Sequence, residues 1–121
     1  MKLNWVTLKV KDLDKSLYFY TELLGIDIAS KFGTPNHQIV MMGEPDKTMI
    51  ELIFDPDSKD IISGNGVSIG LEFSDVDKLI SILKGNGYTI SGPVSPNPQM
   101  RFFFVNDPDG YTIQLIEMQS K

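Results

Sequence analysis

The side chains that most often perform acid–base or nucleophilic chemistry are scarce in this sequence. His37 is the only histidine, and the chain has no cysteine. A thiolate nucleophile and a zinc site with cysteine ligands are therefore excluded. A serine nucleophile would have to use His37 as its base. Because His37 begins a short predicted strand and its neighbours supply no second ligand, we expect an exposed or rim histidine.

Arg101 is another side chain whose position could carry a function. It begins a run of aromatic and β-branched residues that leads to a predicted hairpin turn around Pro108. If the loop of this hairpin has an even number of residues, Arg101, Phe103 and Val105 lie on the same strand face as Gln114. The guanidinium would then point into a cavity and could anchor a carboxylate or phosphate, although a surface salt bridge is the commoner arrangement.

Composition limits the class of protein further. The chain has 121 residues, of which 41% are hydrophobic, and this is enough for the core of one domain. A formal charge of -5 and the lack of a cluster of Lys and Arg argue against a nucleic-acid partner. No apolar run approaches the roughly 18 residues of a spanning helix, and the N-terminus does not resemble a signal peptide. We expect a soluble, cytoplasmic protein without a membrane partner.

The first half of the chain predicts a βαβββ order of elements. Apolar residues alternate over residues 3–10, as is typical of a half-buried strand. Asp12 is the expected N-cap of a helix that ends at Gly25. Glycine and proline turns then separate three short extended runs, near residues 26–32, 36–42 and 48–54.

The second half predicts the same order. Residues 67–73 alternate like a strand, and Ser74 gives a start resembling a capping box to a helix that ends at Gly87. A short strand is expected at about 88–91. An irregular loop is expected over 91–98, before the final hairpin, because this stretch contains three prolines.

The two halves repeat each other at an offset of 63 residues. Ile50–Ile53 aligns with Ile113–Ile116, and the helix starts correspond as well. We therefore predict an α+β fold with two tandem βαβββ modules, about 1–56 and 66–118, in a single domain of residues 1–121. Two twisted sheets, each with a helix on one face, would leave their other faces free to curl around a shared cavity.

A series of short motifs is similar to the vicinal oxygen chelate superfamily, which includes glyoxalase I, bleomycin-resistance proteins and extradiol dioxygenases. The resemblance covers essentially the whole chain. The residues that carry it are Val10–Leu17 with Phe19-Tyr20, Leu24-Gly25, and Asp107–Tyr111 with Ile113–Leu115. These are motifs of the scaffold and fix no chemistry. The resemblance implies a homodimer that binds a small molecule in a mostly apolar cavity.

In the metal-dependent members of this superfamily, the ligands come from the first and last strands of each module. The corresponding positions here are Trp5, Glu51, Ser68 and Gln114. The repeat relates them in pairs, because 5 plus 63 is 68 and 51 plus 63 is 114. A catalytic divalent metal usually needs about three ligands from His, carboxylate or thiolate. Only Glu51 is such a ligand, so we expect no metal cofactor.

Glu51 and Trp5 each keep alternative roles. Glu51 is a cavity-wall carboxylate bonded to Gln114, a general base, or a metal ligand. Trp5 either fills a void or offers a flat surface for an aromatic or extended ligand.

The leading hypothesis is a protein of the glyoxalase and bleomycin-resistance type that binds a small organic molecule without a catalytic metal. Its ligand would contact Trp5, Met42, Glu51, Ser68, Arg101, Phe103 and Gln114. The alternative is a glyoxalase-type lyase or isomerase, or a dioxygenase-like enzyme, with Glu51 as base or metal ligand. A metal or Arg101 would then stabilise an enediolate. A third hypothesis is an accessory protein that keeps the fold only for dimer contacts.

Overall fold

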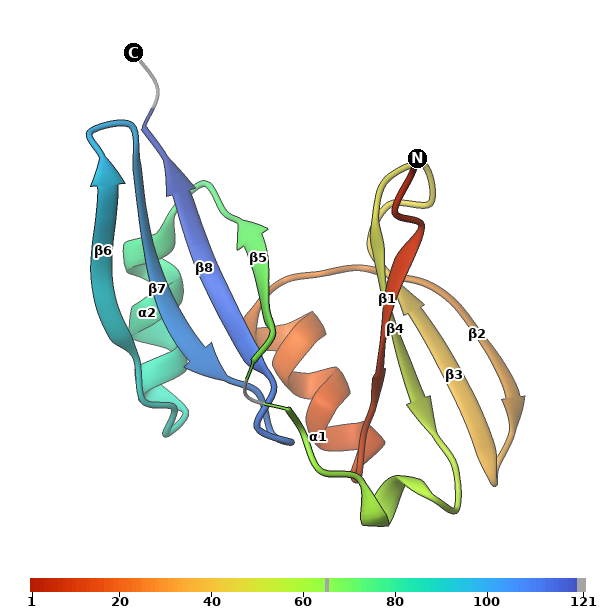
Figure 1. The fold of residues 1–121 in the computed structure, drawn as a ribbon. Coiled ribbons are helices and arrows are strands. Elements are labelled where there is room, and N and C mark those ends of the chain that lie inside the picture. Colours follow the sequence, from red (N-terminus) through yellow and green to blue (C-terminus); the bar gives the residue numbers. More distant parts are fainter. Residues whose placement is uncertain (65, 120–121) are drawn as a thin grey trace. The chain divides into compact units, whose positions relative to one another are not determined.

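The computed structural model describes residues 1–64 and 66–119, which form two compact units, Met1–Ile62 and Ser63–Lys121. Each unit contains a four-stranded mixed sheet with helix on one face (Figure 1). The predicted α+β fold with two tandem βαβββ modules is confirmed. The shared cavity and the single domain stay predictions.

The first unit follows the predicted order of elements. Its sheet has the strand order β1-β4-β3-β2, in which β1 is parallel to β4 and the other pairs are antiparallel. A short 3-10 helix, η2, follows the last strand. The elements are β1 (Trp5–Lys9), α1 (Leu13–Leu17), η1 (Tyr18–Leu23), β2 (Ile28–Thr34), β3 (His37–Met42), β4 (Met49–Phe54) and η2 (Ser58–Asp60).

The helix of the first unit begins as predicted but does not continue as an α-helix. The Asp12 carboxylate accepts a hydrogen bond from the backbone N–H of Lys15 at 3.1 Å and so caps α1. From Tyr18 the turns widen into the π-helical segment η1. The Thr21 hydroxyl donates to the carbonyl of Leu17 at 2.6 Å, and such a bond competes with the regular helical one. The predicted helix is therefore present, but its second part is π-helical.

The second unit has the strand order β5-β8-β7-β6, in which β5 is parallel to β8. Helix α2 covers one face of this sheet (Figure 1). Its N-cap is Asp75, which accepts from the backbone N–H of Lys78 at 3.1 Å, and not Ser74 as predicted. The elements are β5 (Ser68–Glu72), α2 (Val76–Gly85), β6 (Ser91–Asn97), β7 (Met100–Asn106) and β8 (Thr112–Met118).

The segment predicted as an irregular loop is strand β6, and the strand predicted at about 88–91 begins only at Ser91. Prolines lack the N–H that a central strand needs, but an edge strand tolerates them. β6 lies at the edge of its sheet and pairs with β7 only at Ser91, Val94 and Asn97, with register shifts between them.

The β7–β8 hairpin sets which side chains share a face. Asn106 pairs with Thr112, so the loop is Asp107–Tyr111 and has five residues. The buried Asp107 carboxylate organises this loop, because it accepts from the backbone N–H groups of Asp109 and Tyr111, both at 2.9 Å. An odd loop reverses the strand parity that an even loop would give.

In each unit the residues facing the helix form the core. Leu8, Val40 and Leu52 are buried in the first unit, and Val105, Ile113 and Leu115 in the second. We call the opposite face of each sheet its open face. No helix in residues 1–64 or 66–119 is long and apolar enough to cross a membrane.

Candidate active site

The open faces carry the four positions that the sequence suggested. Trp5 and Glu51 come from β1 and β4 of the first unit, and Ser68 and Gln114 from β5 and β8 of the second. The parallel pairing places Glu51 directly beside Thr7, and Gln114 directly beside Gly70. Trp5 and Glu51 therefore share one face of their sheet but are offset by two residues along the strands. Ser68 and Gln114 have the same offset in the second unit.

Glu51 has a hydrogen bond that the sequence did not suggest. The Thr7 hydroxyl donates to Oε1 of the Glu51 carboxylate at 2.5 Å. Bonds from a hydroxyl to a carboxylate are short and stronger than neutral ones. Glu51 is partly exposed and its cross-strand neighbour on the other side is Met41. A carboxylate on the open face beside an apolar side chain can take up or deliver a proton.

Trp5 offers an apolar surface on the same face of the sheet, two residues along the strands from Glu51. Its side chain is 49% exposed, so it does not fill a void within its own unit. An indole of this kind can pack against the apolar part of a ligand.

The second unit presents different chemistry at the equivalent place. A Cβ added to Gly70 would lie 2.8 Å from Cδ1 of Ile116 and 3.4 Å from Oε1 of Gln114. The glycine therefore leaves room for the side chains of its neighbours and gives Gln114 no hydroxyl partner. Phe104 lies across from Gln114 on β7 and makes an edge-to-face contact with Phe102, with ring centroids 5.6 Å apart.

Ser68 is exposed at the start of β5. The letters of Gly66–Gly70 match Gly-x-Ser-x-Gly, but a nucleophile elbow places its serine on a turn between a strand and a helix. Here the chain continues as a strand to Glu72, so the match has no catalytic meaning.

The predicted parity of the Arg101 strand was wrong. Because the hairpin loop is odd, Phe103 pairs with Leu115 and Arg101 with Glu117, on the face that α2 covers. The Arg101 guanidinium bonds Glu117 at 2.7 Å and Asp77 of α2 at 3.0 Å. These bonds raise the pKa of Arg101 above its usual value. The guanidinium also lies 5.4 Å from the ring centroid of Phe103. Arg101 therefore fastens α2 to the sheet and does not face Gln114.

Met42 also lies away from the open face. It is fully buried and pairs with Ile50, on the side of the helix. The methionine across from Glu51 is Met41. Successive residues of a strand point to opposite faces, so only one of these two methionines can lie beside Glu51. A pairing of β3 with β4 shifted by one residue would have placed Met42 there.

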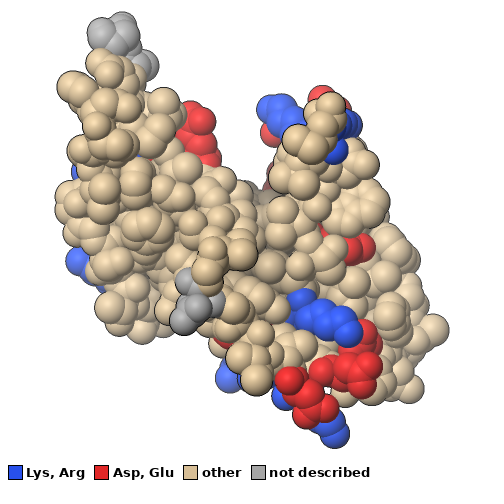
Figure 2. Space-filling view, in the orientation of Figure 1, with Lys and Arg blue, Asp and Glu red and all other residues tan. Residues whose placement is uncertain are grey.

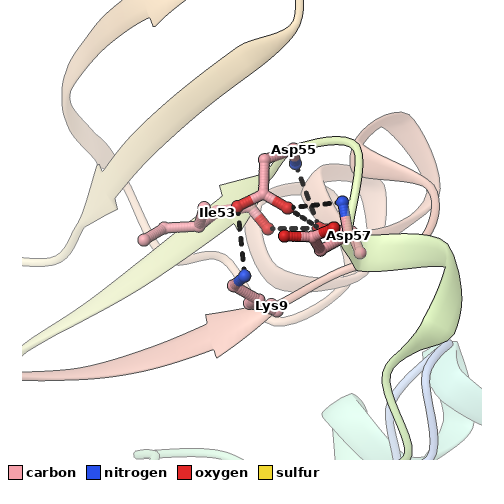
Figure 3. Close-up of polar contacts among 5 residues, drawn as sticks. Lys9, Ile53, Asp55 and Asp57 are labelled. Carbon is pink, nitrogen blue, oxygen red and sulfur yellow. Dashed lines mark hydrogen bonds and ion pairs between the residues drawn. The ribbon is translucent and has the colours of Figure 1, made fainter.

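A polar network joins the ends of β1 and β4, the strands that carry Thr7 and Glu51 (Figure 3). Lys9, the last residue of β1, reaches Asp55 just after β4 at 3.1 Å. The Asp55 carboxylate also accepts from the backbone N–H of Asp57 at 3.0 Å, and Ser58 accepts from the N–H of Asp55 at 3.0 Å. The Lys9 bond lowers the pKa of Asp55 most strongly. This network holds the ends of β1 and β4 in register, and so places Thr7 beside Glu51.

The charged side chains visible in Figure 2 are of mixed sign, with acidic and basic groups side by side around the end of the first unit where η2 lies. A nucleic-acid surface would need a continuous basic stripe. The view in Figure 2 has no such stripe.

The donor set does not fit a metal held by protein ligands. In the part of the chain that the structure describes, no three His, Asp or Glu side chains gather as ligands would. Of the four positions on the open faces, only Glu51 supplies a strong ligand, since an indole cannot coordinate and a hydroxyl and an amide are weak donors.

The fold and the paired positions on the open faces define the class of this protein, one built from two glyoxalase-like modules. The family model "Glyoxalase/Bleomycin resistance protein/Dioxygenase superfamily" matches residues 2–115. The chain belongs to this superfamily.

Several relatives of this chain carry names from one branch of this superfamily. A probable lactoylglutathione lyase of Synechocystis is 34% identical over an alignment of 124 positions that covers 94% of this chain and 93% of the relative. A chloroplastic probable lactoylglutathione lyase of Arabidopsis thaliana is 33% identical over 93% of this chain, but the chain spans only 34% of its length. The trypanothione-dependent glyoxalase I of Leishmania major superposes with a TM-score of 0.81 at 27% identity, over 97% of this chain and 86% of that one.

These relatives correct two expectations. Lactoylglutathione lyases are metal-dependent enzymes, so the prediction of a protein without a cofactor is contradicted. The comparisons also favour the enzyme alternative over the leading hypothesis of a binding protein. The side-chain donors of this chain therefore do not match the metal requirement of its relatives.

Proposed function

We propose that this chain is a glyoxalase I-type lyase or isomerase in which Glu51 transfers the proton. The observation that carries the proposal is the Glu51 carboxylate, partly exposed on the open face of β4 and bonded to Thr7. The names of the relatives that match nearly the whole chain support it.

The chemistry that those names suggest is a proton shift. A lactoyl thioester is an isomer of the hemithioacetal formed by a 2-oxoaldehyde and a thiol. Its formation moves a proton from the carbon that bears sulfur to the neighbouring carbon, and the hydroxyl proton of the first carbon to the oxygen of the second, so no oxidant is needed. Glu51 would take the proton next to the carbonyl, leave an enediolate, and return the proton to the adjacent carbon.

The surroundings of Glu51 suit this role. Met41 is an apolar cross-strand neighbour of Glu51, and Trp5 lies on the same face of the sheet. Glu51 itself is partly exposed, so a substrate can reach its carboxylate. Arg101 does not stabilise the enediolate of this proposal, because its guanidinium pairs with Asp77 and Glu117 on the other face of its sheet.

The test uses the purified chain and a pre-equilibrated mixture of methylglyoxal and glutathione, and follows thioester formation by its ultraviolet absorbance. Separate reactions receive Zn²⁺, Ni²⁺, Mn²⁺, Fe²⁺ or no added cation. We expect turnover that falls roughly 10²- to 10⁴-fold in Glu51→Gln. This variant keeps an oxygen that can accept from Thr7 but cannot act as a base.

The matched control is Glu44→Gln. Glu44 lies exposed in the turn between β3 and β4, where it pairs with Lys47 at 3.3 Å. Its substitution should leave turnover unchanged. Turnover that Glu51→Gln leaves intact would refute the role of Glu51, and no turnover with any cation would refute the lyase.

A small-molecule substrate, a homodimer and a cytoplasmic location remain part of this proposal. Sedimentation velocity of the purified chain would test the homodimer directly.

A further inference from the structure

We propose that Thr7 is a positioning residue for Glu51, which holds one carboxylate oxygen and leaves the other for the substrate. The inference rests on the proposed function of Glu51. The distance of 2.5 Å between the Thr7 hydroxyl and Oε1 is the observation from which it starts.

The strand pairing fixes this contact. Thr7 and Glu51 are direct neighbours on the parallel strands β1 and β4. Threonine is β-branched, so its χ1 angle has few allowed values and its hydroxyl has a defined direction. The Lys9–Asp55 pair at 3.1 Å holds the next part of the same two strands. The hydroxyl is thus presented to the carboxylate by rigid elements.

The hydrogen bond from Thr7 gives the two carboxylate oxygens of Glu51 different roles. Within residues 1–64 and 66–119, Thr7 is the only hydrogen-bond partner of the Glu51 side chain. Oε1 accepts the hydrogen bond from the hydroxyl, and Oε2 is left to approach a carbon-bound proton. A glutamate side chain has several rotatable bonds, and fixing them before the reaction keeps the base near its productive geometry.

The second unit supplies an internal comparison. Gly70 and Gln114 occupy the positions of Thr7 and Glu51, since 7 plus 63 is 70 and 51 plus 63 is 114. Their strands, β5 and β8, pair in parallel in the same register without a hydroxyl at this point. The fold therefore does not require the threonine for strand pairing. The hydroxyl and the carboxylate occur together only in the unit that carries the proposed base.

The experiment compares Thr7→Val, which keeps the shape but lacks the hydroxyl, with Thr7→Ser, which keeps the hydroxyl. In the thioester assay we expect Thr7→Val to lower kcat roughly 10- to 100-fold with little change in KM. Thr7→Ser should restore most of kcat. Thr34→Val, on the exposed edge strand β2 of the same sheet, is the matched control and should change neither constant.

Two further measurements separate this inference from the proposed function. Because Thr7 acts through Glu51, the double variant of Thr7→Val with Glu51→Gln should lose no more activity than Glu51→Gln alone. If Glu51→Gln is inactive but Thr7→Val equals the wild type, the positioning role is refuted and the proposed base survives. If Glu51→Gln stays active, the proposed function itself fails.

A readout without turnover completes the test. Three-bond NMR couplings of the Glu51 side chain should report one rotamer in the wild type and Thr7→Ser, and averaging in Thr7→Val. Equal averaging in all three proteins would overturn the inference even if no substrate were converted.

Discussion

Arg101→Met tests whether the guanidinium supports the fold or meets a ligand. Methionine keeps much of the aliphatic volume but removes the bonds to Glu117 and Asp77. The Glu117 side chain is 19% exposed, and a hydrogen bond between charged groups in such a place contributes about 1.5–3 kcal/mol. The Asp77 side chain is 75% exposed, so its pair adds about 0–1 kcal/mol.

The contact of Arg101 with the ring of Phe103 adds about 0.5–1 kcal/mol. Together these terms predict a loss of about 2–5 kcal/mol in the free energy of unfolding. Glu117 would remain partly buried, with the backbone N–H of Val76 as its other partner at 3.3 Å. For a chain of 121 residues, this loss lowers Tm by roughly 10 °C.

The assay is urea and thermal unfolding of Arg101→Met, followed by KM and kcat at a temperature where the variant is folded. Lys47→Met is the control, because it breaks an exposed pair whose side chains are 67% and 69% exposed and should cost under about 1 kcal/mol. We expect Arg101→Met to have reduced stability and a nearly unchanged KM. Unchanged stability together with a large rise in KM would refute it and return Arg101 to a ligand site.

Two further predictions concern the first unit. The Lys9 bond lowers the pKa of Asp55 below its usual 3.8, so this pair stabilises the fold above about pH 4 and stops doing so as the pH falls through the lowered pKa. Lys9→Met should therefore flatten the acid limb of stability between about pH 5 and pH 2 in urea titrations, and an unchanged limb would contradict the pairing. Gly33→Ala should be strongly destabilising, because Gly33 has φ of +108° and a Cβ there would lie 2.0 Å from the carbonyl oxygen of His37. Thermal unfolding of this variant within a degree of the wild type would show that the β2–β3 turn is built differently.

The sequence predicted the parts of the fold that depend on local pattern and repetition. The offset of 63 residues predicted that both units have the same βαβββ order of elements, as the structure shows. Asp12 was found as a helix cap because its spacing to the first helical turn is a local signal. Strand β6 was missed because its prolines argue against a strand, and only its place at the sheet edge permits them.

The site was less predictable, because it depends on register. One residue in the length of the β7–β8 loop decides whether Arg101 faces α2 or the open face. Thr7 was missed for the same reason. The repeat carried a signal for Thr7, because both units use the same parallel register. Thr7 pairs with Glu51 in the first unit, and the repeat partners Gly70 and Gln114 pair in the second. A prediction of strand register, and not of strands alone, would have found it.

The most direct test of the central claim follows the proton that Glu51 is proposed to move. The rate of thioester formation is measured from glutathione and methylglyoxal, either unlabelled or deuterated at the aldehyde carbon, with the wild type and Glu51→Gln and with each divalent cation. We predict that the wild type forms the thioester, more slowly from the deuterated aldehyde, and that Glu51→Gln loses this activity. Equal rates for the wild type and Glu51→Gln, or no turnover with any cation, would contradict it.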